Sequence, residues 1–294
     1  MVFPRRTLGA ALDASSRNTV IGFLRRPRYE VIPLKGVEEQ IVRHLPTEVK
    51  LTVTASPAKG IDSSIELAER LAKRGFQVVP HISARLVVDD AHLRAILQRM
   101  ATLGLQEIFI IAGDRRDVAG PFTDSLALLR AMAAIDHDIR EVGISGYPES
   151  HPFIDDDVTI QAMWDKRRFA TYIVSNLCFD ARVITAWITR VRRRGVELPI
   201  YVGMPGATDP AKLLRVATKI GVGESARFLR WHTNWFLRMF LPGGQSPNRL
   251  IAGLIPDVTD PTKRIAGLHI YTFNEIERTE KWRRATLAAL EESA

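Results

Sequence analysis

Eight short runs of apolar and β-branched residues alternate with helical patterns from residue 29 to the end of the chain. The runs are nearly continuous in hydrophobicity, as in parallel strands that are covered on both faces. They are residues 29–34, 50–56, 77–83, 107–113, 141–145, 171–177, 199–204 and 267–273. Strict alternation of eight strands with helices predicts a (β/α)₈ barrel of the TIM type. An open doubly wound sheet is the alternative, but no GxGxxG motif follows any run.

The spacing of the elements also predicts how the chain is divided. Residues 1–28 precede the first strand and are expected to form an N-terminal extension, with residues 29–294 as the barrel and catalytic domain. Helical patterns at 210–221 and 224–240 follow the seventh strand. The second of these is expected to form an extra helical insertion before the eighth strand, together with NRLIAGL (248–254).

Composition and charge narrow the class of protein. With 46% hydrophobic and 25% charged residues, the chain is typical of a globular protein. No apolar stretch approaches the roughly 18 residues that a membrane span requires. The single cysteine, Cys178, excludes an internal disulfide and favours a reducing cytoplasm. The formal charge of +8 includes the basic run 190–194 at a predicted helix end, where cations are expected simply as solvated residues that suit the helix dipole. An acidic small-molecule ligand would also suit this charge, whereas nucleic acid is disfavoured because no nucleic-acid-binding motif is present.

Polar side chains gather where the predicted strands end. They are Glu30, Thr52, Thr54, Ser56, His81, Ser83, Asp114, Tyr147, Glu149, His151, Ser175, Asn176, Tyr271, Thr272 and Asn274. In a barrel the carboxyl ends of all strands meet at one mouth, where active sites lie. Layers inside a barrel are usually Val, Ile or Leu, so this density of polar residues predicts a site.

The loop GYPESHP (146–152) leaves the end of the fifth predicted strand. Its two prolines exclude a helix interior and a paired strand, because proline lacks an N–H and fixes φ. The loop could be a metal site, a catalytic site or a stiff turn. Glu149 and His151 match no standard zinc spacing, and no metal is expected.

Glu30 and Asp114 form the best carboxylate pair for catalysis. Glu30 lies inside the apolar run YEVIP, and because burying a charge is costly, its presence there indicates an inward, functional carboxyl group. Glu30 could instead point outward to an arginine. Asp114 could cap the next turn, His81 could be a hydrogen-bonded core histidine and Tyr271 could serve packing alone. A carboxyl pair on separate strands fits general acid chemistry beside stabilisation of a cation. Acyl and phosphoryl transfer are only weakly supported, because the sequence has no GxSxG motif, no credible cysteine nucleophile and no P-loop.

Seven segments resemble, in the same order, the methylenetetrahydrofolate reductase family. They are YEVIP (29–33), PHIS (80–83), AGD (112–114), GYPESHP (146–152), VSNLCFD (174–180), PIYVGMPG (199–206) and GLHIYTFN (267–274). The resemblance covers about residues 29–274 and implies a (β/α)₈ barrel. It also implies an NAD(P)H-dependent hydride transfer that interconverts 5,10-methylene- and 5-methyl-tetrahydrofolate.

The resemblance implies roles for individual residues. Glu30 matches the acid that helps to protonate the folate, and Asp114 matches the aspartate that contacts the pterin and stabilises the cation. Asn176 stands where a glutamine usually contacts folate and nicotinamide, and Tyr271 matches a tyrosine that shapes the substrate pocket. The residues that match those holding FAD in the family are His81, Gly113, Tyr147, His151 and Lys166.

Several departures from the family pattern concern the cofactor. Ala112 replaces the arginine of the usual Leu-Arg-Gly-Asp, and the segment Thr54–Pro57 differs from the usual Thr-Tyr-Gly-Ala-like motif. FAD is the family expectation, and direct hydride transfer from NADH without flavin is the alternative. A non-catalytic folate-binding paralogue and an oxidoreductase for another pterin are the alternative functions. The basic charge favours polyglutamylated folate, and a homo-oligomer is compatible with the sequence.

Overall fold

The computed structural model describes Leu8 and residues 12–55, 60–115, 117–151, 154–208 and 247–293. The helices expected at 210–221 and 224–240 lie outside the described residues. Ser56 and Pro57, expected after the second strand, and Pro152 of the GYPESHP loop also lie outside them.

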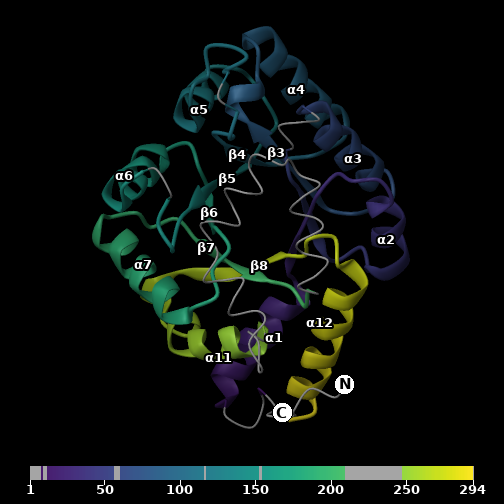
Figure 1. Cartoon of the computed structure of the whole chain (residues 1–294), viewed down its shortest axis with the longest axis vertical. Helices are drawn as coiled ribbons and strands as arrows, with labels where there is room; N and C mark the ends of the chain where they lie inside the picture. The colour runs from purple at the N-terminus through teal and green to yellow at the C-terminus, as the bar shows by residue number, and fades with distance from the viewer. Residues whose placement is uncertain are drawn as a thin grey trace.

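Eight parallel strands close into a barrel in which each strand pairs with its neighbours in chain order (Figure 1). They are β1 (Arg28–Val31), β2 (Lys50–Val53), β3 (Val78–Ser83), β4 (Glu107–Ile111), β5 (Glu141–Gly146), β6 (Tyr172–Ser175), β7 (Ile200–Pro205) and β8 (Ile265–Tyr271). The last pairing, of β1 with β8, is also parallel. The predicted (β/α)₈ fold is therefore confirmed.

Helices surround the barrel on its outside (Figure 1). They are α1 (Ala14–Arg25), α2 (Val37–His44), α3 (Asp62–Ala72), α4 (Asp90–Thr102), α5 (Ser125–Ala133), α6 (Asp156–Lys166), α7 (Ala181–Arg193), α11 (Pro247–Val258) and α12 (Ile276–Glu291). Asp89, Asp124 and Asp180 precede α4, α5 and α7, and each side chain accepts hydrogen bonds from N–H groups of the first turn. These caps satisfy donors that a helix leaves unpaired at its start.

The segment expected as an N-terminal extension contains α1. This helix packs against α11, α12 and β8. It lies beside α12, the C-terminal helix, in Figure 1. α11 begins at Pro247, one residue before the NRLIAGL segment, and packs against α7. The division at residue 28 stays a prediction.

Apolar residues form two clusters, one between strands and helices and one inside the barrel. The outer cluster contains apolar residues of both strands and helices. The inner cluster comprises Val79, Phe109, Tyr172 and Val174, which come from strands alone. A Cβ on Gly143 would lie 2.4 Å from the ring of Tyr172 and 2.5 Å from that of Phe109. Gly143 is therefore needed for these two rings to fill the interior.

The N-terminal end of the barrel is filled by a paired cationic network. The Arg28 guanidinium lies 4.4 Å from the ring centroid of Tyr172 and 3.9 Å from that of Tyr201. It also pairs with Glu107, whose second oxygen pairs with Lys50. A buried charge is tolerable when it is paired in this way. In barrels of this kind, chemistry belongs to the opposite end, where the strands terminate.

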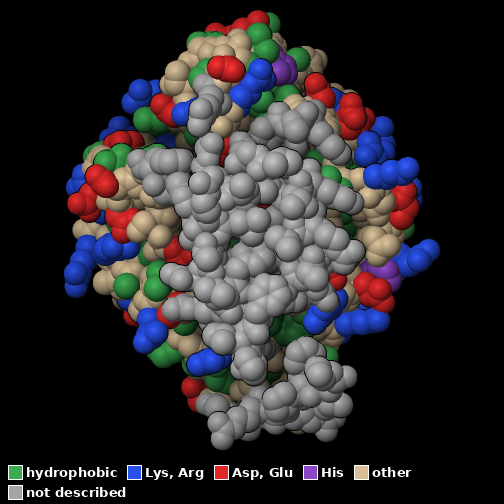
Figure 2. All heavy atoms as spheres, in the orientation of Figure 1, with side chains coloured by type: hydrophobic (Ala, Val, Ile, Leu, Met, Phe, Trp, Pro, Cys, Tyr) green, Lys and Arg blue, Asp and Glu red, His purple; other side chains and the backbone are tan. Residues whose placement is uncertain are grey.

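Charged side chains of both signs are interspersed around the rim of the face shown in Figure 2. The excess of Lys and Arg is therefore not gathered into one patch among the coloured residues of this face. Among the described helices, none has the length and hydropathy to cross a membrane.

Candidate active site

The carboxyl ends of the strands bring most of the predicted site residues to one end of the barrel. Glu30 is in β1, His81 in β3 and Tyr271 in β8. Asp114 follows β4, and the GYPESHP loop follows β5. Their mutual interactions, described below, link these elements into one cluster.

Glu30 is the carboxyl group at the base of this cluster. Its side chain is 15% exposed, and its Oε2 lies 3.1 Å from Nε2 of His269. Its backbone carbonyl accepts hydrogen bonds from the N–H and the hydroxyl of Thr272, which fixes the strand end. Burial raises the pKa of Glu30 to about 7, and the electrostatic interaction with His81 opposes this rise. Glu30 therefore holds a proton in part of the molecules near neutral pH.

Two buried histidines flank Glu30 and are neutral near pH 7. Burial lowers the pKa of His269 to about 3 and that of His81 to about 4. The contact of Glu30 with His269 is therefore a hydrogen bond to a neutral imidazole and not an ion pair. The ring of His81 packs 4.6 Å from that of Phe109, between centroids. Its Nε2 is buried and has no hydrogen-bond partner in the described part of the chain.

Two tyrosines connect Glu30 to the loop after β5. The Tyr271 hydroxyl donates to the backbone oxygen of Ser175 at 3.3 Å. Burial raises the pKa of Tyr271, and the charges of Glu30 and Tyr147 add to the rise. Burial also raises the pKa of Tyr147. A hydrogen bond with Ser145 opposes this rise, and the charge of Asp114 adds to it. The interactions therefore run pairwise from Glu30 to Tyr271, from Tyr271 to Tyr147 and from Tyr147 to Asp114.

The GYPESHP loop turns back on itself through its own contacts. The rings of Tyr147 and His151 meet edge to face with centroids 5.0 Å apart. Ser150 has a positive φ of 70° and donates its N–H to the Tyr147 carbonyl at 3.3 Å. Glu149 accepts a contact of 3.4 Å from the Cys178 thiol, which ties the loop to the segment after β6. Burial raises the pKa of Cys178, so this contact involves the thiol and not the thiolate.

Asp114 reaches the mouth through a backbone turn that requires glycine. Gly113 has a φ of +88°, and a Cβ there would lie 1.9 Å from Oγ of Ser83. A side chain at residue 113 would therefore be strained and would collide with β3. Asp114 is exposed. Burial lowers the pKa of His151, and the charge of Asp114 opposes this decrease. This geometry indicates that Gly113 serves the turn that presents Asp114.

Two predicted site residues are not brought into the cluster by any contact within the described residues. Lys166 is buried at the end of α6, and its Nζ lies 3.2 Å from Oγ of Ser125 at the start of α5. Burial lowers the pKa of Lys166 to about 8. Asn176 is exposed after β6, and its Oδ1 accepts the N–H of Leu177 at 2.9 Å. Their predicted binding roles stay predictions.

Among the described residues, no group of three or more His, Cys, Asp or Glu side chains is arranged to hold a metal ion. The chemistry that the cluster can perform is proton transfer at Glu30 and electrostatic stabilisation by Asp114.

Comparison with known proteins assigns the family. A family model described as methylenetetrahydrofolate reductase matches residues 35–222, which is more than half of the chain. The chain belongs to the methylenetetrahydrofolate reductase family. The resemblance inferred from the seven sequence segments is thereby confirmed.

The similar curated proteins are much longer than the segments that match. Methylenetetrahydrofolate reductase 2 of Saccharomyces cerevisiae is 28% identical over 142 residues, covering 45% of this chain and 23% of the yeast protein. Methylenetetrahydrofolate reductase 1 of Schizosaccharomyces pombe is 26% identical over 144 residues, covering 46% and 24% respectively. The match therefore spans about a quarter of the length of these relatives.

Likeness to solved structures is weak. The crystal structure of tryptophan synthase subunit alpha from Legionella pneumophila is 10% identical and has a TM-score of 0.41. The structural match covers 85% of this chain and 99% of the tryptophan synthase subunit. The assignment rests on the sequence family alone.

Members of this family are generally flavin-dependent, and the sequence resemblance predicts that four side chains of this chain would hold the flavin. Tyr147 and His151 lie together, but His81 is 4% exposed against Phe109. Lys166 is buried between α5 and α6. A flavin diphosphate needs accessible cations and N–H donors. The four side chains do not form one accessible surface and so do not fit a flavin as a set.

His269 is the residue of this site that the sequence reasoning missed. The sequence pattern places it in the strand expected at 267–273 and does not mark it as a site residue. Alternate residues of a strand face the same side, so His269 shares a side with Tyr271. That period of two, applied from Tyr271 back along β8, is the signal that could have found it.

The buried position of Glu30 predicts a pH-dependent effect on stability. Its pKa of about 7 in the folded chain exceeds its ordinary value of 4.5. The folded state thus binds this proton more tightly, and the stability that Glu30 contributes is full below pH 4.5 and lost as pH rises through 7. Glu30→Gln does not titrate, so its stability relative to the parent should increase between pH 5 and pH 8 by on the order of 2 kcal/mol. Urea unfolding at both pH values measures this, and an equal difference at both would contradict it.

Proposed function

We propose that this chain is an NAD(P)H-dependent oxidoreductase that reduces 5,10-methylenetetrahydrofolate to 5-methyltetrahydrofolate, or catalyses the reverse reaction. The observation that carries the proposal is the Glu30 carboxyl, at a strand end of a barrel of this family, with a pKa of about 7. An acid with this pKa can both give and take a proton near neutral pH.

The proposed chemistry uses two carboxyl groups in separate roles. Glu30 gives its proton to a nitrogen of the folate bridge, and the bond from that nitrogen to the bridging carbon breaks, with the electron pair going to nitrogen. The bridging carbon is left as an iminium cation on the other nitrogen, and a hydride from the nicotinamide converts it to a methyl group. The Asp114 carboxylate stabilises the cation while it exists. In the reverse direction Glu30 receives the proton.

Assaying the purified chain with methylenetetrahydrofolate and either NADH or NADPH tests the proposal. We expect nicotinamide oxidation that requires the folate. Folate binding without turnover in either direction would instead favour the non-catalytic folate-binding paralogue. Turnover with another reduced pterin in place of the folate would favour the third alternative.

The same preparation distinguishes two routes for the hydride. FAD that copurifies with the chain would absorb in the visible range and would be reduced when the nicotinamide is added. A colourless preparation with full activity would support direct transfer from the nicotinamide. Glu30 and Asp114 have the same roles in either route.

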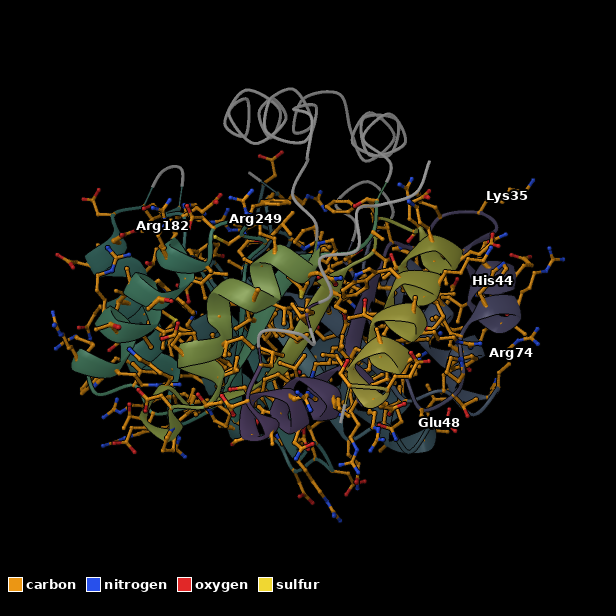
Figure 3. The ribbon with its side chains drawn as sticks, turned by 90° about the horizontal axis from the view of Figure 1, so that it is seen from below. Lys35, His44, Glu48, Arg74, Arg182 and Arg249 are labelled. Atoms are coloured by element: carbon orange, nitrogen blue, oxygen red, sulfur yellow. The ribbon has the colours of Figure 1, made fainter. Side chains whose placement is uncertain are left out.

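Cations at the strand-end side of the barrel support a preference for polyglutamylated folate. Figure 3 shows Lys35, Arg182 and Arg249 toward one end of the barrel and Glu48 toward the other. Lys35 follows β1, and Arg182 is in the first turn of α7, after β6. Exposed charges attract an anionic tail mainly at low ionic strength.

We expect a KM several-fold lower for the polyglutamate than for the monoglutamate at low salt, with the difference shrinking at high salt. Lys35→Gln should reduce this difference in KM. Arg74→Gln should not reduce it, although it also removes an exposed charge, because Arg74 lies just after α3. Equal KM values for the two folates at low salt would contradict the preference.

A further inference from the structure

A buried histidine holds one oxygen of the Glu30 carboxyl. His269 is in β8, is 1% exposed, and its Nε2 lies 3.1 Å from Glu30 Oε2. β8 pairs with β1 so that Tyr271 is the register partner of Glu30 and His269 that of Arg28. The hydrogen bond therefore crosses between neighbouring strands inside the barrel. Glu30 Oε1 makes no hydrogen bond within the described residues, although the side chain is 15% exposed.

The environment of His269 determines which ring nitrogen carries its proton. Nδ1 is buried and has no hydrogen-bond partner in the described part of the chain. An N–H at Nδ1 would be a buried donor without an acceptor, which proteins rarely tolerate. We therefore assign the proton to Nε2, which donates it to Glu30 Oε2.

Other titratable groups near this pair come from β3, from the loop after β5, and from β1 and β8 themselves. Arg28 of β1 disfavours a charge on His269, and burial does so more strongly. His81 of β3 interacts with both Glu30 and His269. Tyr271 of β8 and, through it, Tyr147 after β5 lie within electrostatic reach of Glu30. Of these groups, His81 and Tyr271 interact with Glu30 through space, whereas His269 alone of the described side chains makes a hydrogen bond to its carboxyl.

We propose that His269 is a positioning residue that holds Oε2 of Glu30, so that Oε1 is the oxygen that carries the transferable proton. Oε2 accepts the Nε2–H of His269, whereas Oε1 makes no hydrogen bond with a described residue. The catalytic consequence rests on the proposed function of Glu30 as the acid. The hydrogen bond itself does not depend on that function and can be measured separately.

The first experiment titrates Glu30 directly in the full chain. Carbon-13 labelling of glutamate carboxyl groups gives a resonance for Glu30 that is identified by its absence in Glu30→Gln. A hydrogen bond donated to a carboxylate favours the charged form. His269→Leu, which removes the donor, should therefore move the midpoint upward by about 1 to 2 pH units. His269→Gln, whose amide N–H can reach the position of Nε2, should leave the midpoint within about 0.5 unit of the parent.

The second experiment measures kinetics of the same variants with methylenetetrahydrofolate. His269→Leu should lower kcat about 10-fold and change the folate KM by less than about 2-fold, because a misplaced acid slows the chemical step and not binding. The pH at which folate reduction declines on the alkaline side should move upward with the Glu30 midpoint. His269→Gln should restore most of kcat.

Each outcome bears on the proposal. An unchanged Glu30 midpoint in His269→Leu with a cooperative unfolding transition would overturn it, as would a Gln variant as impaired as the Leu variant. If His269→Leu does not fold, His269→Asn replaces it, because its amide is too short to reach Glu30. A parent chain without folate reductase activity but with the expected titration shifts would overturn the proposed function and leave the hydrogen bond intact.

Discussion

Glu30→Gln is expected to lower turnover with methylenetetrahydrofolate by about 100-fold or more. The amide is nearly the same size as the carboxyl and can still accept the Nε2–H bond of His269, so the site keeps its shape. It has no proton to give at neutral pH, and the folate bridge must then open without acid assistance. The loss should appear in kcat, since folate binding does not need the proton. Steady-state kinetics near pH 7 measure it.

Glu141→Gln is the matched control for this substitution. Glu141 is also a glutamate of a barrel strand, but it is the first residue of β5 and so lies at the opposite end of the barrel. Its carboxylate is 3.8 Å from Arg28 and its side chain is 52% exposed, so its loss should change turnover by less than about 2-fold. Glu30→Gln with normal kcat would remove Glu30 from the role of general acid.

The sequence is sufficient to predict the strands of this fold because each is a short apolar run with its own boundaries. Tyr172 and Val174, for example, belong to an apolar run that predicts a buried strand without knowledge of the neighbouring strands. Register along the barrel is not local. That Glu30 pairs with Tyr271 across more than two hundred residues depends on closure of the barrel, which no single run encodes.

The candidate site was predictable to the extent that it depends on strand ends. Glu30, His81 and Tyr271 each lie in a predicted strand and face the same interior. Lys166 could not be placed by this reasoning, because it lies on a helix and its contact with Ser125 depends on how α5 and α6 pack. The contact of Glu149 with Cys178 is similar, since two loops must approach before the thiol finds an acceptor.

The neutral state of the two histidines is also a tertiary property. A histidine in a strand pattern is titratable near neutral pH in isolation. Burial on all sides lowers the pKa of His269 to about 3, and this turns a nominal ion pair with Glu30 into a hydrogen bond with defined donor and acceptor. Glu30 therefore holds a proton in part of the molecules near neutral pH, because burial disfavours its charge and none of the described Lys or Arg side chains pairs with its carboxyl. This is the condition that its proposed role requires.

Asp114→Asn is expected to lower turnover by about 100-fold, with a smaller effect on the folate KM. Asp114 is exposed in the structure, and its charge already acts on Tyr147 and His151 across the mouth. A bound pterin would displace water from this carboxylate, so its attraction for a cation would be stronger than in the open site. The amide keeps the turn after Gly113 but has no net charge. Single-turnover measurement of hydride transfer reports the loss at the chemical step.

Asp117→Asn is the matched control, because Asp117 is exposed on the same loop and the substitution changes the net charge equally. It should keep turnover within about 2-fold of the parent, since surface charges away from the reacting atoms are well screened. Equal losses in the two variants would mean that the general field of the loop, and not the position of Asp114, affects the reaction. Full activity of Asp114→Asn would remove the cation-stabilising role and leave Glu30 as the only carboxyl group in the proposed chemistry.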